Sequence, residues 1–257
     1  MPIRVNFDIG TIAAFILVIT RVGSALLILP LPGFKDLSRM PRIVLVVSIA
    51  VSLYPAWPPV ITGAFGGGRF LLAMLGESAA GLLLGLAIAF VHEAFQLTAQ
   101  AVSLQSGFSF ASVFDPSSKA DSSVFQVVTQ MATGLLFFIT DTHLYLLRLL
   151  THSYDVYSAS NAVLERASLK VVLLLGTQMF VAGLKMALPL VVLLLLIELS
   201  LALLGRLHAQ LQLLTLSFPV KSALSFAFLA AMMVRWPHLY EQLVTRTFRL
   251  VEQLAPI

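Results

Sequence analysis

The residues best suited to catalysis are scattered along this sequence of 257 residues. A zinc-protease helix needs a second histidine four residues after the first, and His92-Glu93 has none at that spacing. Asp141 and His143 are two residues apart, which is more typical of a pair at a helix end than of a metal site. The sequence contains no cysteine and no Gly-x-Ser-x-Gly motif for a nucleophilic serine. We therefore expect no enzyme activity, no metal and no cofactor.

Four charged residues lie inside long apolar segments: Arg21, Glu77, Lys185 and Glu198. At the centre of a helix that faces lipid, each charge would cost ~2.5–3.5 kcal/mol, so the four would together cost roughly 10 kcal/mol. That is comparable with the whole stability of a domain, about 5–15 kcal/mol. We expect these side chains to pair with each other, to line a watery path or to face charged partner subunits. Lys185 and Glu198 would need a hairpin near Pro189, or a partner chain, in order to meet.

The composition indicates which class of protein carries these charges. Hydrophobic residues make up 59% of the sequence, charged residues only 11%, and the mean hydropathy is +0.96. Soluble domains have about 25% charged residues. We predict a single all-α integral membrane domain over residues 1–257, with about six hydrophobic helices, which contacts membrane lipid. The net charge of +4 comes from scattered Lys and Arg residues, so we expect no binding to nucleic acid.

The apolar segments that must position the charges are expected at residues 9–31, 43–61, 70–104, 124–150, 171–204 and 211–234. As one helix, residues 171–204 would span roughly 50 Å, against ~30 Å of hydrocarbon. This segment is therefore expected to kink at Pro189, to form a hairpin or not to be simply embedded in lipid. Residues 239–255 form an amphipathic pattern, which predicts a helix lying on a membrane or against a partner.

The most basic short loop near the start of the chain is at residues 33–42. It carries Lys35, Arg39 and Arg42 against Asp36. The positive-inside rule predicts that this loop lies in the cytoplasm and that the N-terminus lies on the other side of the membrane.

Residues 105–123 interrupt the apolar pattern in the middle of the chain. Gly, Ser, Asp and Pro concentrate there, and Asp121 or Ser122 is expected to cap the next helix. Phe108, Phe110 and Phe114 lie in the same loop. The loop is either an ordinary connector whose rings pack on helix ends, or a segment that folds back into a cavity or pore.

Several motifs occur in a characteristic order. The most specific runs from Gln105 to Pro116 and reads Gln-Ser-Gly-Phe-Ser-Phe-Ala-Ser-Val-Phe-Asp-Pro. The others are Arg21-Val22-Gly23, Leu136-Phe137-Phe138 followed by His143, Ala187-Leu188-Pro189, Leu204-Gly205-Arg206 and Phe218-Pro219. Together these motifs resemble the FliR family, which are components of the flagellar type III export gate.

Three departures from the family pattern affect local turns. The family often has Asn-Gly-His where Asp141, Thr142 and His143 stand, a Pro at the position of Ala209 and a Gly at the position of Ser217. Turn geometry at these positions is therefore not inferred from the resemblance.

The resemblance implies a subunit of the bacterial inner membrane, in the flagellar basal body, with a periplasmic N-terminus. It implies partners similar to FliP, FliQ and FlhB in a helical assembly that passes unfolded flagellar proteins. The family's central loop forms part of a plug, which makes gate candidates of Gly107, Phe108, Phe110, Phe114, Asp115 and Pro116. The charges expected to face other subunits or line the path are Arg21, Glu77, Lys185, Glu198 and Arg206.

Two alternatives to a flagellar gate subunit remain at this point. One is the equivalent subunit of a virulence injectisome. The other is a secondary transporter with ion sites at Lys185, at Glu198 and at a helix broken at Pro189. An inverted repeat would support a transporter, and the sequence shows none by inspection.

Overall fold

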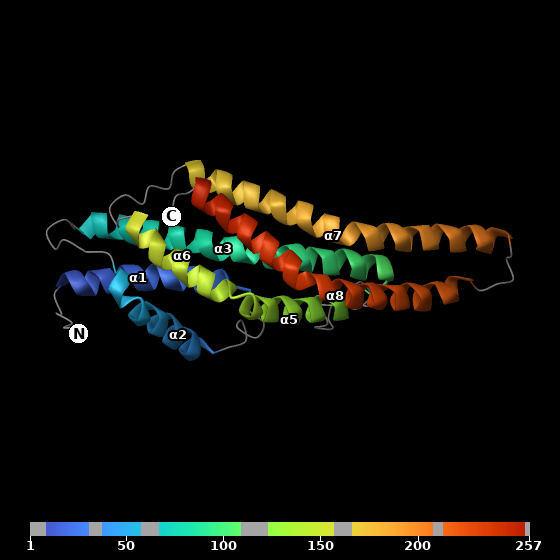
Figure 1. Ribbon diagram of the computed structural model, residues 1–257, viewed down its shortest axis with the longest axis horizontal. Coiled ribbons are helices and arrows are strands. Elements are labelled where there is room, and N and C mark those ends of the chain that lie inside the picture. The colour runs from blue at the N-terminus through green and yellow to red at the C-terminus, as the bar shows by residue number, and fades with distance from the viewer. Residues whose placement is uncertain are drawn as a thin grey trace. The chain divides into compact units, whose positions relative to one another are not determined.

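The computed structural model describes residues 9–30, 38–57, 67–108, 123–156, 166–207 and 213–254. Over these residues the chain is helical, which confirms the predicted all-α class (Figure 1). The elements are α1 (Ile9–Ile28), α2 (Arg39–Ser52), the short 3-10 helix η1 (Tyr54–Ala56), α3 (Gly67–Ser106), α5 (Val124–Ile139), α6 (Thr142–Val156), α7 (Arg166–Leu207) and α8 (Leu213–Leu254).

Four of these helices, α1, α3, α7 and α8, are long and apolar enough to cross a membrane. Taken as one broken span, α5 and α6 give a fifth. The helix in the expected second segment, α2, has only 14 residues, whereas a span needs about 20. The described residues therefore give fewer full spans than the six apolar segments of the sequence.

Helix α7 is continuous through Pro189, so the hairpin expected near this proline does not form. A proline removes one backbone hydrogen bond, but contacts with neighbouring helices can hold a long helix together. Helix α8 likewise joins the expected segment 211–234 and the expected tail helix 239–255 into one element of 42 residues, which contains Pro219 and Pro237.

The expected segment 124–150 is divided in two. Asp141 has a φ of 52°, in the left-handed region, and α5 ends just before it while α6 begins just after it. At the start of α5, the side chain of Ser123 accepts from the backbone N–H of Gln126, and the Gln126 side chain accepts from the backbone of Ser123. The cap is therefore Ser123, not Asp121 or Ser122, because only Ser123 has glutamine three residues later to complete a capping box.

Contacts divide the chain into two compact units. Unit 1 consists of residues 1–90, 141–175 and 244–257, and unit 2 consists of residues 91–140 and 176–243. Helices α3, α7 and α8 each contribute residues to both units, so the units do not follow the order of the chain.

In unit 1, α1 packs closely against the first half of α3. A Cβ atom built at Gly81 would overlap the backbone carbonyl of Arg21, and one built at Gly85 would overlap that of Ala25. Two glycines four residues apart lie on one face of a helix, and their missing side chains let two backbones approach. This approach places Arg21, in the middle of α1, directly against α3.

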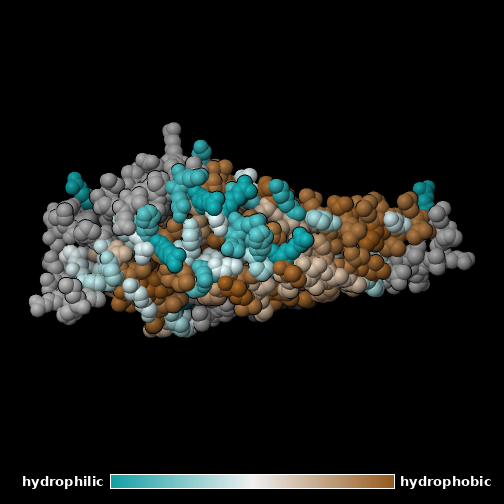
Figure 2. All heavy atoms as spheres, viewed as in Figure 1, coloured by the Kyte–Doolittle hydropathy of each residue, from teal (hydrophilic) through white to brown (hydrophobic). Residues whose placement is uncertain are grey.

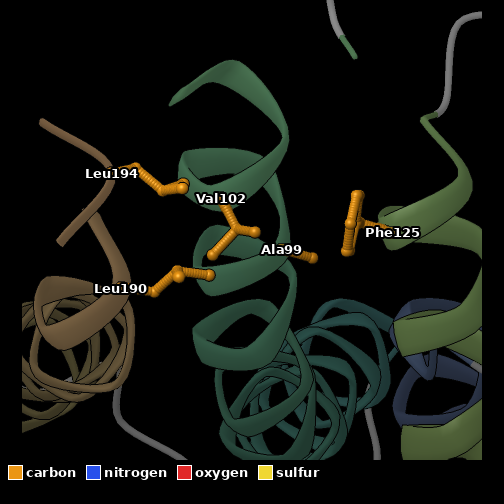
Figure 3. Close-up of a cluster of buried hydrophobic side chains, with 5 residues drawn as sticks. All are labelled: Ala99, Val102, Phe125, Leu190 and Leu194. Carbon is orange, nitrogen blue, oxygen red and sulfur yellow. The ribbon is translucent and has the colours of Figure 1, made fainter. Parts of the chain in front are cut away.

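In unit 2, the second half of α3 lies between α7 and α5. Figure 3 shows Val102 and Ala99 of α3 between Leu190 and Leu194 of α7 on one side and Phe125 of α5 on the other. All five side chains are buried. Leu224, Phe228 and Leu229 of α8 pack against this cluster.

Large apolar side chains cover much of the surface of α7 and α8. Figure 2 shows continuous hydrophobic surface over the end of α7 and the start of α8. The exposed residues of α7 include Phe180, Val181, Leu188, Leu199 and Leu203. Such a surface requires lipid or protein against it.

Candidate functional site

A buried ion pair links α1 and α3 in unit 1. Arg21 Nε lies 2.5 Å from Glu77 Oε2, and the two side chains are 1% and 0% exposed. Arg21 Nη1 donates a hydrogen bond of 2.6 Å to Ser153 Oγ of α6. The guanidinium lies 4.1 Å from the ring centroid of Tyr154. Internal pairing, the first of the three explanations left open by the sequence, therefore accounts for the burial of these two charges.

The cluster around Arg21 is buried from solvent. Glu77 Oε1 and the Tyr154 hydroxyl are also buried, and neither has a hydrogen-bond partner in the described part of the chain. Removing one partner of a buried ion pair leaves an uncompensated charge, which costs far more than the pair contributes. The cluster therefore fixes how α1, α3 and α6 meet.

A second candidate site lies in unit 2, at the end of α3, where the central loop begins. Gly107 has a φ of 88°, its N–H donates to the carbonyl of Leu104, and the N–H of Phe108 donates to the carbonyl of Ser103. These two bonds form a Schellman motif, in which the left-handed position after the helix favours glycine. Gly107 therefore ends the helix sharply and directs Phe108 back toward the bundle.

The ring of Phe108 contacts three other phenylalanines. Its centroid lies 5.2 Å from that of Phe125 in α5, 5.5 Å from Phe218 and 5.7 Å from Phe226, both in α8. Phe125 and Phe226 also stack on each other at 4.9 Å. We call these four residues the Phe108 cluster, and it fixes Phe108, near the start of the central loop, to two helices.

A polar network lies beside this aromatic cluster. Lys221 Nζ of α8 donates to Glu198 Oε2 of α7 at 2.9 Å, and Gln105 Nε2 of α3 donates to the same oxygen at 3.3 Å. The hydroxyls of Ser106 and Ser225 are 2.5 Å apart. These contacts hold α3, α7 and α8 together at the root of the loop.

The remaining predicted residues are not brought together. Lys185 and Arg206 are exposed on α7. Glu198 pairs with Lys221 and not with Lys185, so a hairpin that joins Lys185 and Glu198 is wrong, as is the broken helix expected of a transporter site. The other gate candidates lie outside the described residues: Phe110, Phe114, Asp115 and Pro116.

Sequence reasoning overlooked the partners of the predicted residues. Lys221 lies in an apolar segment, so the criterion that singled out Lys185 could also have found Lys221. Phe125, Phe226 and Ser153 carry no such signal, because a Phe or Ser in an apolar helix is ordinary. Only the packing of the helices shows their role.

None of these centres has the composition of a metal or catalytic site. The described residues contain no group of three His, Asp or Glu side chains close enough to hold a metal ion. Arg21 pairs with Glu77, and Glu198 pairs with Lys221, so these charges join helices instead.

Comparison with known proteins adds the decisive observation. The sequence profile of the family described as bacterial export proteins, family 1, matches residues 12–247. The chain belongs to this family. All the residues singled out above, from Arg21 to Phe226, lie within the matched range.

The curated relatives of this export protein have one name in common. A protein of Escherichia coli strain K12 is 26% identical over 91% of this chain and 89% of its own length. A protein of Bacillus subtilis strain 168 is 28% identical over 89% of each chain, and one of Pectobacterium carotovorum is 30% identical over 68% of this chain and 67% of its own. All three are named "Flagellar biosynthetic protein FliR". The resemblance to the FliR family is therefore confirmed.

Proposed function

We propose that the chain is a non-enzymatic subunit of the flagellar type III protein export gate in the bacterial inner membrane. In this role it helps to form and to plug the conduit for unfolded flagellar proteins. Membership of the bacterial export proteins and the FliR relatives support this assignment. The sequence has no phosphate-binding loop motif, so the energy for transport comes from another component.

The observation that carries the proposal is the length and exposure of three helices. Helices α3, α7 and α8 have 40, 42 and 42 residues. At 1.5 Å per residue each is roughly 60 Å long, about twice the ~30 Å of hydrocarbon in a bilayer. On α7, exposed apolar side chains run from Leu169 to Leu204, roughly 50 Å at 1.5 Å per residue, which is more than one bilayer thickness. We infer that other apolar subunits cover part of this helix. FliP-like and FliQ-like subunits are the proposed neighbours, with an FlhB-like export protein at the same gate.

Assembly is tested by purifying the affinity-tagged chain from its native membrane. The expected result is recovery of FliP-like and FliQ-like subunits with it in a detergent-stable complex. A chain that purifies alone as a stable monomer and binds a small solute would instead favour a transporter.

The plug is proposed to lie in the loop that follows α3, at residues 107–123, because Gln105 and Ser106 of the expected loop 105–123 are still helical. The rings of Phe110 and Phe114 would provide hydrophobic closure, and Asp115-Pro116 would restrict the loop backbone. The Phe108 cluster supports this role, because it attaches the root of the loop to α5 and α8.

Deletion of residues 110–115 tests the sealing role. With assembly intact, we expect ions to leak across the inner membrane. The paired changes Phe110→Leu and Phe114→Leu keep an apolar seal and should not leak, whereas Phe110→Ser and Phe114→Ser should. Unchanged ion permeability in the deletion variant would reject the plug.

The proposed orientation has a periplasmic N-terminus. The chain has no native cysteine, so a single cysteine added before Ile9 gives a clean signal. A membrane-impermeant maleimide should label it in intact spheroplasts. Labelling only after lysis would show that the N-terminus lies in the cytoplasm.

A further inference from the structure

Lys185 points away from the rest of unit 2. The face of α7 that packs on α3 carries Gly183, Met186, Leu190 and Leu194, all buried, and a Cβ atom at Gly183 would meet the carbonyl of Ala94. At about 100° per residue, Lys185 lies roughly half a turn from the centre of that face. Its ammonium group is therefore on the outer side of the helix.

The surface around Lys185 is an apolar ridge. The α7 outer ridge consists of Lys185 and five exposed residues on the same side, namely Val181, Leu188, Val192, Leu199 and Leu203. These apolar residues are between 44% and 65% exposed, and they lie on both sides of the lysine along the helix. Lys185 is therefore a single cation inside an apolar strip, and it does not mark the end of that strip.

The polar groups of Lys185 are not satisfied by unit 2. Within the described residues, its ammonium makes no hydrogen bond or ion pair. The only acid in α7, Glu198, is thirteen residues away and is bonded to Lys221. Pro189, four residues later, has no N–H to donate to the carbonyl of Lys185. The ridge thus presents both a cation and a carbonyl that lacks its usual helical donor.

Lipid is a poor neighbour for this arrangement. In the hydrocarbon, an unpaired ammonium near the helix centre is strongly unfavourable. If Lys185 instead marked the headgroup layer at the start of a span, the exposed Phe180, Val181 and Leu184 would lie in water. An apolar protein surface with a matching negative charge satisfies both the lysine and its apolar neighbours.

We propose that the α7 outer ridge is a docking surface for an apolar helix of a different gate subunit, and that this helix carries one Asp or Glu opposite Lys185. The carboxylate accepts from the ammonium group, and apolar side chains of the partner cover Val181, Leu188 and Val192. This inference rests on the proposed function as a subunit of an assembly, and it identifies the chemistry of one of its contacts.

The test uses a membrane-permeable carbodiimide, which joins a lysine amine to a carboxylate only when the two are in contact. In the complex isolated after treatment, mass spectrometry should find Lys185 joined to an acidic residue within an apolar segment of another subunit. Lys185→Arg keeps the charge but cannot form this amide, so the complex should assemble while the cross-link is lost. Lys185→Glu should lower recovery of the complex about tenfold, because two carboxylates would then face each other in an apolar contact.

A charge exchange completes the test. Lys185→Glu combined with Lys at the cross-linked acidic position of the partner should restore recovery and export. The inference is overturned if Lys185 yields no cross-link to an apolar segment, joins only another copy of this chain, or is neutral when changed to Glu. Co-purification of FliP-like and FliQ-like subunits in those cases would leave the proposed function standing, whereas its absence would reject the function itself.

Discussion

At the scale of single residues, Arg21 shows how a charge is accommodated in an apolar bundle. Its guanidinium uses a carboxylate, a hydroxyl and an aromatic ring from two other helices. A planar guanidinium can make these contacts in different directions at once, which a lysine ammonium does less well. Glu77, Ser153 and Tyr154 together therefore stabilise the buried charge of Arg21.

Arg21→Met should destabilise the protein by about 3–5 kcal/mol, because it leaves the buried Glu77 carboxyl without its partner. The double variant Arg21→Met with Glu77→Met should recover most of that loss, since both charges are then absent. The midpoint of thermal unfolding of the purified complex measures both effects. Arg39→Met, at an exposed position in α2, is the matched control and should change the midpoint little. A double variant no more stable than Arg21→Met would show that the pair is not the reason for the loss.

Asp141 takes a left-handed backbone conformation between α5 and α6. Its φ of 52° is costly for residues with a branched Cβ and mild for Asn or Gly. We expect Asp141→Asn to be neutral or slightly stabilising and Asp141→Val to cost about 1–2 kcal/mol. Thermal unfolding of the two variants checks this, with Ile139→Val, at an exposed helical position, as the control. Equal midpoints for Asn and Val would mean that residue 141 is free to leave the left-handed region.

At the scale of elements, the absence of side chains at the glycines of α3 determines how closely α1 and α3 approach each other. Gly81 lies against the backbone carbonyl of Arg21, and a backbone atom cannot move aside as a flexible side chain can. The approach of these two helices also brings Arg21 to Glu77. Packing of small residues and pairing of charges are therefore two parts of one contact.

The same substitution at two glycines should have opposite effects. Gly81→Ala should destabilise by about 1–3 kcal/mol through overpacking against α1. Gly176→Ala, in α7, should stabilise by up to about 1 kcal/mol, because a Cβ there meets nothing within 4 Å and alanine is the better helix former. Thermal unfolding of the two variants side by side gives the comparison. A stabilising Gly81→Ala would contradict the close approach of α1 and α3.

At the scale of the whole molecule, the apolar segments predicted the long helices but not their ends or partners. The expected segment 124–150 runs across Thr140-Asp141-Thr142-His143, four consecutive polar residues that could have indicated the break between α5 and α6. Glu198 was correctly singled out as a charge that needs a partner. The choice of Lys221 over Lys185 depends on which face of α7 meets α8, and sequence distance alone does not determine this.

Assembly itself leads to a prediction about accessibility. The chain has no cysteine, so Leu188→Cys on the exposed side of α7 can be followed with a maleimide without background. We expect fast labelling when the chain is produced alone in detergent, and at least tenfold slower labelling in the complex with FliP-like and FliQ-like subunits, because apolar protein then covers the ridge. Leu190→Cys, two residues away on the buried face, should label slowly in both samples and only become reactive on unfolding. Equally fast labelling of Leu188→Cys in both samples would show that no other subunit covers this side of α7. Contact with partner subunits would then not explain the length of the helix.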